Sequence, residues 1–421
     1  MSIPQRMGRT FDSLSIYNYR LFWFSQLISV SGTWMQTTAQ AWLVLKLTNS
    51  SVALGTVVLL QFLPVTVFTL FGGVLADRLP KRAVLLGTQS VAAVQALLLA
   101  ILVITNTVQL WQIYGLALLL GIVNAFDTPT RQSFVSELVG PARLPNAVAL
   151  NSTLFNAARI VGPALGGIII SVVDIGQAFL FNAISFVPVL AALLLMRAAE
   201  FHASARPARG NIFRQVGEGI RYAVRTPSVL IILLTMAVVG TFGYNYNTIL
   251  PLLAKYVLHA GATGLGLLTS AVGIGSLVAA LVVAATHQAT QRVLLAAAFI
   301  FSLLLMAIGF SPSLPLTLVL LVLMGIAGIV YTASSNSNLQ MNTPGPLRGR
   351  VMSLYILLFM GTTPIGGFLV GVLSARIGVQ PTIVLMGAIC LVGVVAACGY
   401  AWLSGRVRAR NTIVAQPSLN E

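Results

Sequence analysis

The sequence is poor in charged side chains, above all in acidic ones. Asp and Glu together number eight in 421 residues, and all charged residues make up only 8% of the chain. A water-soluble domain is usually about one quarter charged, so this chain could not cover a surface that faces water. The scarcity of charge excludes a soluble protein, including a soluble enzyme.

Cysteine and histidine are scarce as well. Cys390 and Cys398 lie in one apolar run, which provides neither a disulfide framework nor the spacing of metal ligands. The three histidines and eight acids are scattered, so no group gathers for acid–base or metal catalysis at one membrane depth. We therefore predict no catalytic residue, no metal and no cofactor. A Gly-x-x-x-x-Gly-Lys-Ser/Thr loop for ATP is also lacking.

Apolar residues, in contrast, are abundant, at 57% of the chain with a mean hydropathy of +0.93. A helix needs about 20 mostly apolar residues to cross a bilayer. Cutting the sequence at charges, Pro and Gly leaves twelve such runs, so we predict an all-α integral membrane protein with twelve transmembrane helices. The runs lie near 20–45, 52–76, 83–105, 109–128, 147–171, 175–197, 228–254, 263–285, 292–311, 314–338, 350–374 and 379–403.

The basic residues are distributed unevenly between the two sides that these crossings define. Twenty of the 24 Lys and Arg residues fall on one side, three fall on the other, and Arg159 lies inside a run. Basic loops stay in the cytoplasm, so both termini are predicted to be cytoplasmic. This topology also accounts for the net charge of +16 without a nucleic-acid partner.

The longest polar interval divides the twelve runs into six and six. We predict an N-terminal six-helix bundle at 1–197, a cytoplasmic basic linker at 198–227, a C-terminal six-helix bundle at 228–403 and a cytoplasmic tail at 404–421. Within the linker, apolar residues recur at helical spacing from Ile212 to Val224 between arginines. This pattern is typical of an amphipathic helix that lies on an anionic leaflet, although a regulatory docking site is an alternative.

The two halves also share weak internal similarity. Residues 121–167 and 325–371 match without a gap, at ten positions that include Gly121, Gly162 and Gly167. A parallel repeat of this kind is typical of proteins that bind their ligand near the midplane, between two bundles.

Several motifs resemble those of the major facilitator superfamily. The loop after the second run contains Gly73, Asp77, Arg78, Lys81 and Arg82, and is similar to the superfamily's signature loop. In that family, the acid and the following basic residues hold the two bundles together in the outward-facing state. Pro80 stands where glycine is usual, and the corresponding loop of the second half lacks an acid.

A wider set of motifs resembles one branch of this superfamily, which includes the bacterial enterobactin exporter and macrolide-efflux-like proteins. The motifs are Asn18–Trp23, Asp127–Arg131, Asn146–Asn151, Glu218–Tyr222 and Arg348–Val351. The resemblance implies a monomeric secondary transporter in the bacterial cytoplasmic membrane, which exports a small amphipathic molecule such as a siderophore or drug by alternating access. An uptake permease and a membrane sensor or scaffold without transport are the alternatives.

The fifth run carries a second resemblance. Its Gly162-Pro163 and Gly166-Gly167 pairs look like the Gly-Pro-x-x-Gly-Gly element of the superfamily's antiporters, although Ala158 replaces an upstream glycine. Glycines allow close approach of backbones, and proline removes one helical hydrogen bond. The resemblance implies a role in gating or coupling; the alternative is a close-packed helix with no such role.

Candidate cargo-binding residues are polar or aromatic groups inside the apolar runs. Arg159 stands out because an ionisable residue near the midplane is costly and usually functional. It is predicted either to bind cargo or to pair with protein, for instance with Asp127. Aromatic and amide groups on an apolar wall suit a large amphipathic molecule. The remaining candidates are Gln36, Gln40, Asn151, Phe155, Tyr244, Asn245 and Tyr355.

Coupling to an ion is less evident in the sequence. A proton-driven exporter needs a carboxylate or histidine that can change its protonation state. Asp77, Asp127, Glu137 and Asp174 are all placed at or beyond the membrane edge by the predicted runs. Proton coupling is therefore expected from the resemblance, with Asp127 as the carrier and Arg131 as its neighbour.

Overall fold

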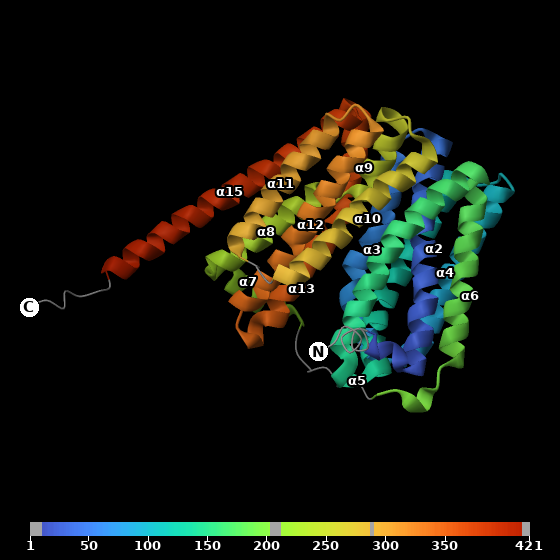
Figure 1. The fold of residues 1–421 in the computed structure, drawn as a ribbon, viewed down its shortest axis with the longest axis horizontal. Coiled ribbons are helices and arrows are strands. Elements are labelled where there is room, and N and C mark those ends of the chain that lie inside the picture. The colour runs from blue at the N-terminus through green and yellow to red at the C-terminus, as the bar shows by residue number, and fades with distance from the viewer. Residues whose placement is uncertain (1–10, 203–211, 287–289, 415–421) are drawn as a thin grey trace, which may run out of the picture.

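The computed structural model describes the backbone of residues 11–202, 212–286 and 290–414. Within these ranges it describes every side chain except those of 69–78, 212–216, 284–286, 346 and 404–414. This part of the chain is built from helices and contains no strand. The all-α membrane fold expected from the sequence is thereby confirmed (Figure 1).

The first half of the chain contains five long helices. They are α2 (Tyr17–Thr48), α3 (Ser51–Arg78), α4 (Lys81–Ile104), α5 (Leu110–Val172) and α6 (Ile175–Leu195), with short 3-10 helices η1 (Asp12–Ser15) and η2 (Ala198–Glu200) at either side.

The second half begins with α7 (Ile212–Arg225) and contains two interrupted crossings. The first consists of α8 (Pro227–Phe242), α9 (Tyr246–Leu252) and the π-helix η3 (Leu253–Val257), and the second of α13 (Gly345–Gly361) and α14 (Thr363–Ile377). The continuous helices are α10 (Gly261–Thr286), α11 (Gln291–Gly309), α12 (Leu314–Asn342) and α15 (Val379–Val414).

Helix α5 consists of two crossings joined by a sharp turn. It has 63 residues, and Gly140 breaks it with a φ of 68° and a ψ of 174°. The limb before Gly140 reaches α2 through Arg131 and Gln26, and the limb after it reaches the same part of α2 through Leu150 and Trp23. The second limb therefore runs back alongside the first.

The number of crossings agrees with the sequence prediction. Ten stretches of the described chain are long and apolar enough to span a membrane, and α5 is one of them although it crosses twice. Helix α2, with 32 residues, is long enough but carries buried polar side chains such as Gln26 and Gln36, which lower its hydropathy. With α2 and the second limb of α5 included, the described residues provide twelve helical segments long enough to cross a membrane.

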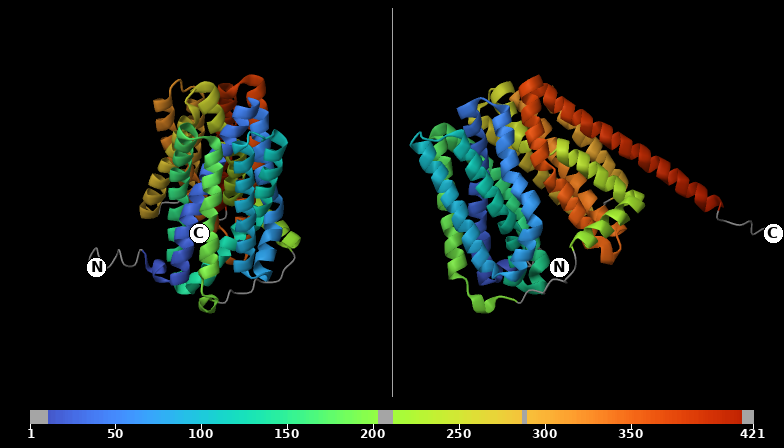
Figure 2. Two further views of the ribbon diagram at one scale, coloured as in Figure 1. Left: turned by 90° about the vertical axis from the view of Figure 1, so that its right-hand side faces the viewer. Right: turned by 180° about the vertical axis from the view of Figure 1, so that it is seen from behind.

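The helices form two groups that are close at one end and far apart at the other. Helices α2 to α6 pack together, α8 to α15 pack together, and the groups meet mainly through α5 with α10 and α3 with α14. Figure 2 shows the groups diverging toward the end that carries the α5 turn and α7. We call this end, which holds Lys81, Arg143, Arg197 and Arg350, the basic end, and the other the opposite end.

Glycines at equivalent places in the internal repeat make equivalent contacts. A Cβ on Gly121 would lie 2.5 Å from the carbonyl oxygen of Gln61 in α3, and one on Gly325 would lie 2.4 Å from that of Val272 in α10. The repeat therefore keeps small residues where backbones of neighbouring helices touch.

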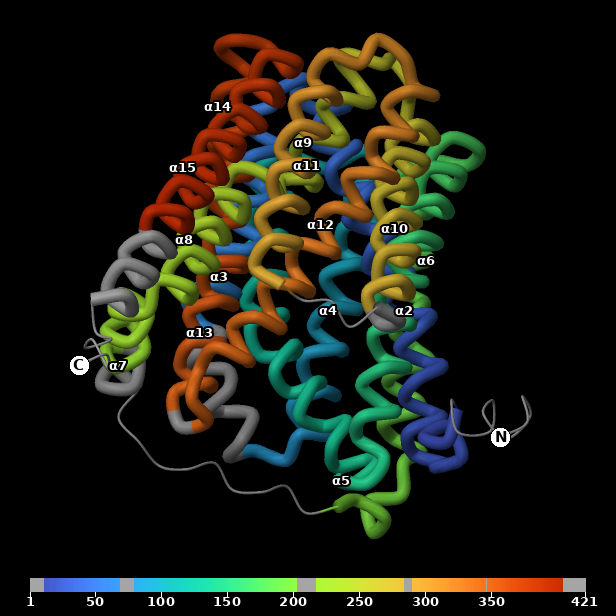
Figure 3. The backbone as a smooth tube through the Cα atoms, turned by 60° about the vertical axis from the view of Figure 1, so that its left-hand side comes forward, coloured from blue at the N-terminus to red at the C-terminus, as the bar shows by residue number. Residues whose placement is uncertain are grey.

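Helix α7 occupies the region where the sequence predicts an amphipathic helix. One side of it is fixed to α12 and α13, because Tyr222 donates to the Asn342 carbonyl oxygen at 2.7 Å and Glu218 forms an ion pair with Arg350. Ile220 and Val224, one turn apart, are 48% and 61% exposed. Figure 3 shows α7 beside α13 at the basic end. The two exposed apolar side chains are suited to contact with a membrane surface.

Candidate functional site

A central cavity of about 640 Å³ lies between the two groups of helices. Its first wall comes from α2 to α6 and includes Thr33, Trp34 and Gln61. Its second wall comes from α9, α10, α12, α13 and the start of α14, and includes Asn247, Thr332 and Phe359. Because both halves contribute to one cavity, a change in their relative position would change access to it.

At the opposite end, two helix pairs close the cavity through backbone contact. A Cβ on Gly167 of α5 would lie 2.7 Å from the Ala262 carbonyl oxygen of α10, and one on Gly266 would lie 2.6 Å from the Pro163 carbonyl oxygen. In the same way, a Cβ on Gly371 of α14 would lie 2.5 Å from the Ser51 carbonyl oxygen of α3. Only glycine permits helices to approach this closely.

A lysine adds a polar contact to this closure. Lys255 of η3 donates to the carbonyl oxygen of Leu45, and to the Asn49 Oδ1 at 2.6 Å, at the C-terminal end of α2. Asn49 has a left-handed backbone with a φ of 50°, which ends α2 and leaves carbonyl oxygens there for an outside donor. The positive charge also suits the negative end of the helix dipole.

The gating candidates of the fifth run all lie in the second limb of α5. Gly162 packs on α2, where its Cβ would lie 2.5 Å from the Ser31 carbonyl oxygen, and Gly166 packs on Met35 of the same helix. Gly167 and the Pro163 carbonyl face α10 instead. This limb therefore lies between its own half and the other, and its small residues allow contact on both sides.

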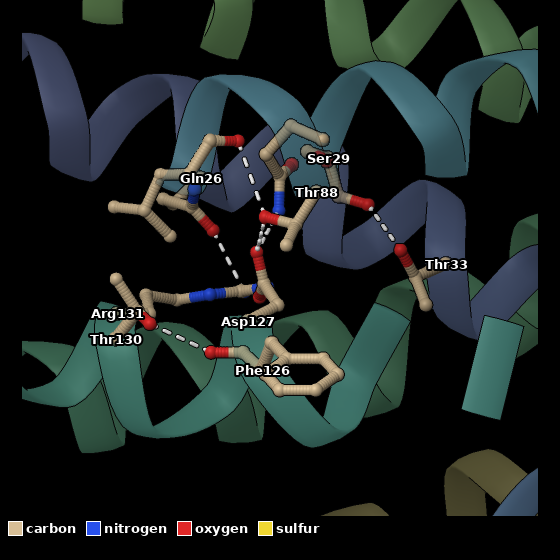
Figure 4. Close-up of polar contacts among 10 residues, drawn as sticks. Gln26, Ser29, Thr33, Thr88, Phe126, Asp127, Thr130 and Arg131 are labelled. Atoms are coloured by element: carbon tan, nitrogen blue, oxygen red, sulfur yellow. Dashed lines mark hydrogen bonds and ion pairs between the residues drawn. The ribbon is translucent and has the colours of Figure 1, made fainter. Parts of the chain in front are cut away.

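Asp127 is the centre of a buried polar cluster in the wall of the cavity (Figure 4). Its Oδ1 accepts hydrogen bonds from Thr88 at 2.8 Å and from Gln89 at 2.7 Å, and its Oδ2 pairs with Arg131. Arg131 also donates to the Gln26 Oε1 at 2.8 Å. Asp127 is 1% exposed, so its charge is buried among these partners.

Arg159 lines the cavity but is not joined to Asp127. In the described part of the chain, its hydrogen-bond partner is the Ser276 Oγ of α10, at 3.3 Å. Asn151 and Phe155, on the same face of α5, also line the cavity. The structure therefore brings these three sequence candidates together, on the wall that α5 provides.

The two tyrosine candidates belong to the second half, across the cavity from α5. Tyr244 lines it and stacks on Phe301, with ring centroids 5.0 Å apart. Tyr355 lies behind this wall, donates to the Thr332 carbonyl oxygen at 3.2 Å and stacks on Phe359. Asn245 is 2% exposed and is placed at the break between α8 and α9, where it donates to Thr241.

Gln36 and Gln40 lie inside the first half, away from the cavity lining. The Gln36 amide donates to Gln95 at 3.0 Å and accepts from Asn182 at 2.7 Å, which joins α2 to α4 and α6. Gln40 is also buried in α2. The α2 residues that line the cavity include Thr33, Trp34 and Thr37.

Two basic residues of the signature loop, Lys81 and Arg82, bond within the first half. Lys81 pairs with Glu137 of α5, and Arg82 donates to the Leu194 carbonyl oxygen of α6 at 2.9 Å. Gly73, Asp77 and Arg78 lie in the last turns of α3, and their side chains are outside the described residues.

Four residues of the site and of its supporting contacts were not predicted from the sequence. Gln89 and Gln95 are polar residues inside an apolar run, a signal that was available. Lys255 is one of three basic residues at the opposite end and follows Pro251 closely, which is a weaker signal. Nothing in the sequence singles out Ser276, because serine is common in membrane helices.

A helical membrane protein in which two groups of helices share one central cavity, closed at one end, has the architecture of a solute transporter. The chain belongs to the family described as transmembrane secretion effector, within the major facilitator superfamily; this family matches residues 9–416. The resemblance inferred from the sequence motifs is thereby confirmed.

Relatives with described activities cover most of the chain. The Staphyloferrin A transporter of Staphylococcus aureus is 25% identical over 88% of this chain and 94% of its own. The multidrug efflux pump Tap of Mycolicibacterium fortuitum is 28% identical over 89% and 94%, and macrolide efflux protein A of Streptococcus pyogenes is 23% identical over 88% and 92%.

Solved structures of transporters share the fold. A POT family transporter in complex with a thioalcohol-conjugated peptide has a TM-score of 0.73 at 13% identity, over 91% of this chain and 96% of that one. The nucleoside transporter NupG has a TM-score of 0.72 at 12% identity, over 91% and 98%. A bacterial homologue of the lysosomal transporter Spinster, in an inward-facing conformation, has a TM-score of 0.64 at 16% identity, over 96% and 98%.

Proposed function

We propose that this protein exports a small amphipathic molecule across the bacterial cytoplasmic membrane by alternating access. The observation that carries the proposal is the central cavity, which both halves line and which glycine contacts close at the opposite end. Basic loops stay in the cytoplasm, so the basic end is the cytoplasmic one and the described conformation faces inward. Cargo enters from the cytoplasm, and rocking of the halves then opens the opposite end.

The proposed cargo class follows from the cavity wall and the relatives. Aromatic side chains such as Trp34, Phe155 and Tyr244 offer apolar surface, while Asn151 and Arg159 offer polar contacts. Such a mixture suits a molecule with both characters. The relatives are named for a siderophore, for macrolides and for several drugs.

We propose for this protein the same domain organisation that the sequence predicts. Residues 1–197 and 228–403 act as two bundles within one monomer, 198–227 is the cytoplasmic linker and 404–421 the cytoplasmic tail. The contact of α7 with α12 and α13 supports attachment of the linker to the second bundle. The hydrogen bond from His202 to the Glu137 carbonyl oxygen, 2.8 Å long, supports attachment of its beginning to the first.

The orientation can be tested with reporter fusions. A reporter active only in the cytoplasm, joined at Pro207 or at Glu421, is expected to be active at both positions, because twenty basic residues lie on that side. A fusion at Thr107, in the loop between α4 and α5, is the matched control and should be inactive. Activity at Thr107 alone would reverse the proposed direction of the cavity.

We further propose that export is coupled to a proton carried by Asp127. Among the described residues that line the cavity, it is the one carboxylate, and it is held by Arg131, Thr88 and Gln89. Protonation would remove the charge that pairs with Arg131, and would free Arg131 to find another partner. A change in one buried pair thus offers a physical link between proton binding and movement of the helices.

The Lys255 contact leads to a prediction about the resting conformation. Replacing Lys255 with Met removes two charge-assisted hydrogen bonds that join the halves at the opposite end, each worth about 1.5–3 kcal/mol. The population open at that end should rise about tenfold or more. Distances between spin labels on Thr107→Cys and Ser313→Cys, with both native cysteines replaced, report this population. Lys46→Met, which changes an exposed lysine at the same end, is the control. Equal distance distributions in wild type, Lys255→Met and Lys46→Met would show that Lys255 does not hold the opposite end closed.

Everted membrane vesicles test the proposed export directly. Their outer face is the cytoplasmic one, so an energised vesicle that contains the protein should accumulate a macrolide or an amphipathic xanthene dye above vesicles without it. Dissipation of the proton gradient should remove the difference. Accumulation in right-side-out vesicles alone would replace export with uptake, and accumulation in neither orientation would contradict transport of this cargo class.

A further inference from the structure

The charges on the cavity wall do not balance. Three described residues that line the cavity are charged, namely Asp127, Arg131 and Arg159. Asp127 and Arg131 pair with each other. Arg159 therefore leaves one positive charge in the cavity without a described carboxylate beside it.

The hydrogen bond from Arg159 to Ser276 is long, and Ser276 has a second hydrogen-bond partner. The guanidinium donates to the Ser276 Oγ at 3.3 Å, near the long end of the hydrogen-bond range. The Ser276 hydroxyl itself donates to the Val272 carbonyl oxygen at 2.8 Å. Ser276 would therefore keep a hydrogen bond if Arg159 were lost. An arginine inside a membrane protein is energetically costly, and this one weak contact does not account for its presence.

The surroundings of Arg159 suit a molecule that has both an anionic group and an aromatic or apolar part. Phe155, one turn away on α5, is 45% exposed toward the cavity, and Tyr246 lines the cavity from α9. A guanidinium is a planar fork of donors that matches a carboxylate or phosphate, and the low dielectric of the membrane interior strengthens that pairing.

We propose that the cargo carries an anionic group that binds Arg159, while its apolar part lies against Phe155 and the tyrosine wall. This inference rests on the proposed export and specifies its substrate class. The anion displaces Ser276 of the second half from Arg159 of the first. Binding of cargo therefore exchanges a contact between the halves for a contact with cargo, at the place where the halves must move.

A matched pair of dyes tests the proposal with purified protein in detergent. The pair is a xanthene dye with a free carboxylate and its methyl ester, which have nearly the same size and ring system. For Arg159→Gln, we expect the carboxylate dye to bind about 10- to 100-fold more weakly, as for loss of a charge-assisted hydrogen bond, with the ester changed less than about twofold. Arg159→Lys keeps the charge and should fall between wild type and Arg159→Gln for the carboxylate dye.

Two further variants separate binding from structure. Ser276→Ala removes the protein partner of Arg159 and should leave carboxylate binding unchanged or stronger, because it frees the guanidinium. Arg292→Gln removes an exposed positive charge at the start of α11, outside the cavity, and should change neither dye. Equal losses on both dyes for Arg159→Gln, or the same losses for Ser276→Ala, would overturn the proposal, and so would a failure of wild type to prefer the carboxylate.

Failure of the inference and failure of the proposed function give different results in everted vesicles. If wild type accumulates the ester but does not favour the carboxylate, export stands and the anionic cargo class is wrong. If wild type accumulates neither dye, both are wrong. If Arg159→Gln retains ester accumulation while it loses carboxylate accumulation, both are supported.

Discussion

Replacing Gly167 or Gly266 with valine should reduce transport about tenfold or more. A Cβ at either position would lie within 2.7 Å of a backbone oxygen on the facing helix, and backbone cannot move aside as a flexible side chain can. The two halves could no longer close at the opposite end. The inward-facing state, to which cargo binds, would be depleted.

The same helix offers a matched control for this substitution. A Cβ on Gly115 of α5 would meet no atom within 4 Å, so Gly115→Val tests the effect of valine in the helix without the contact. Both proteins are measured for dye accumulation in everted vesicles and for yield in the membrane. Normal accumulation by Gly167→Val, or an equal loss in Gly115→Val, would show that close approach of α5 and α10 is not needed.

Removal of the Asp127 carboxylate is expected to have the second large effect. Asp127→Asn leaves Arg131 in a mostly buried position without its counter-charge, because the Asp127 side chain is 1% and the Arg131 side chain 19% exposed. Loss of one partner of a buried ion pair costs about 3–5 kcal/mol. A lower melting temperature and loss of proton-driven accumulation should follow.

A double variant separates the stability of this pair from its function. Asp127→Asn combined with Arg131→Gln removes both charges, and should regain most of the melting temperature because no charge is left unpaired. Transport driven by a pH gradient in proteoliposomes should stay lost, since no carboxylate remains to carry the proton. Recovery of gradient-driven transport in the double variant would exclude Asp127 as the carrier.

The sequence was sufficient to predict the fold because a bilayer imposes a simple requirement. Each crossing needs a long apolar run, and twelve runs with alternating basic loops leave few arrangements. Even α2 was predicted, although Gln26 and Gln36 lower its hydropathy, because a crossing needs only mostly apolar residues and these two side chains carry no charge. The bounds of helices were less accurate, as in α15, which continues to Val414 beyond the predicted limit of 403.

The largest difference concerns the first limb of α5. The predicted crossing ended at 128 because apolar runs were cut at charges, Pro and Gly, and Pro129 and Arg131 follow. In the structure, the Asp127 and Arg131 side chains pair with each other and bond to Gln26, Thr88 and Gln89 from neighbouring helices. The helix therefore continues to the break at Gly140. Charge alone does not distinguish a loop from such a buried cluster, because the uncharged partners Gln26, Thr88 and Gln89 lie far away in the sequence.

The binding residues were predicted in part for a similar reason. Asn151, Phe155 and Arg159 share one face of a helix, and helical spacing was enough to group them. Gln36 lies about one third of a turn from the cavity-lining Thr37, a rotation that depends on how α2 packs against α4 and α6. A single sequence fixes the spacing along a helix but not its rotation in the bundle.

The claim that the closed contact between α5 and α10 must open during transport can be tested with one reversible cross-link. The hydroxyl oxygens of Ser171 and Thr263, one from each half, lie 2.7 Å apart at the opposite end. In protein without Cys390 and Cys398, Ser171→Cys with Thr263→Cys should form a disulfide that keeps this end closed. We predict that accumulation in everted vesicles stops upon oxidation and returns upon reduction, whereas either single variant transports under both conditions. Undiminished accumulation with the disulfide fully formed would contradict alternating access through this cavity.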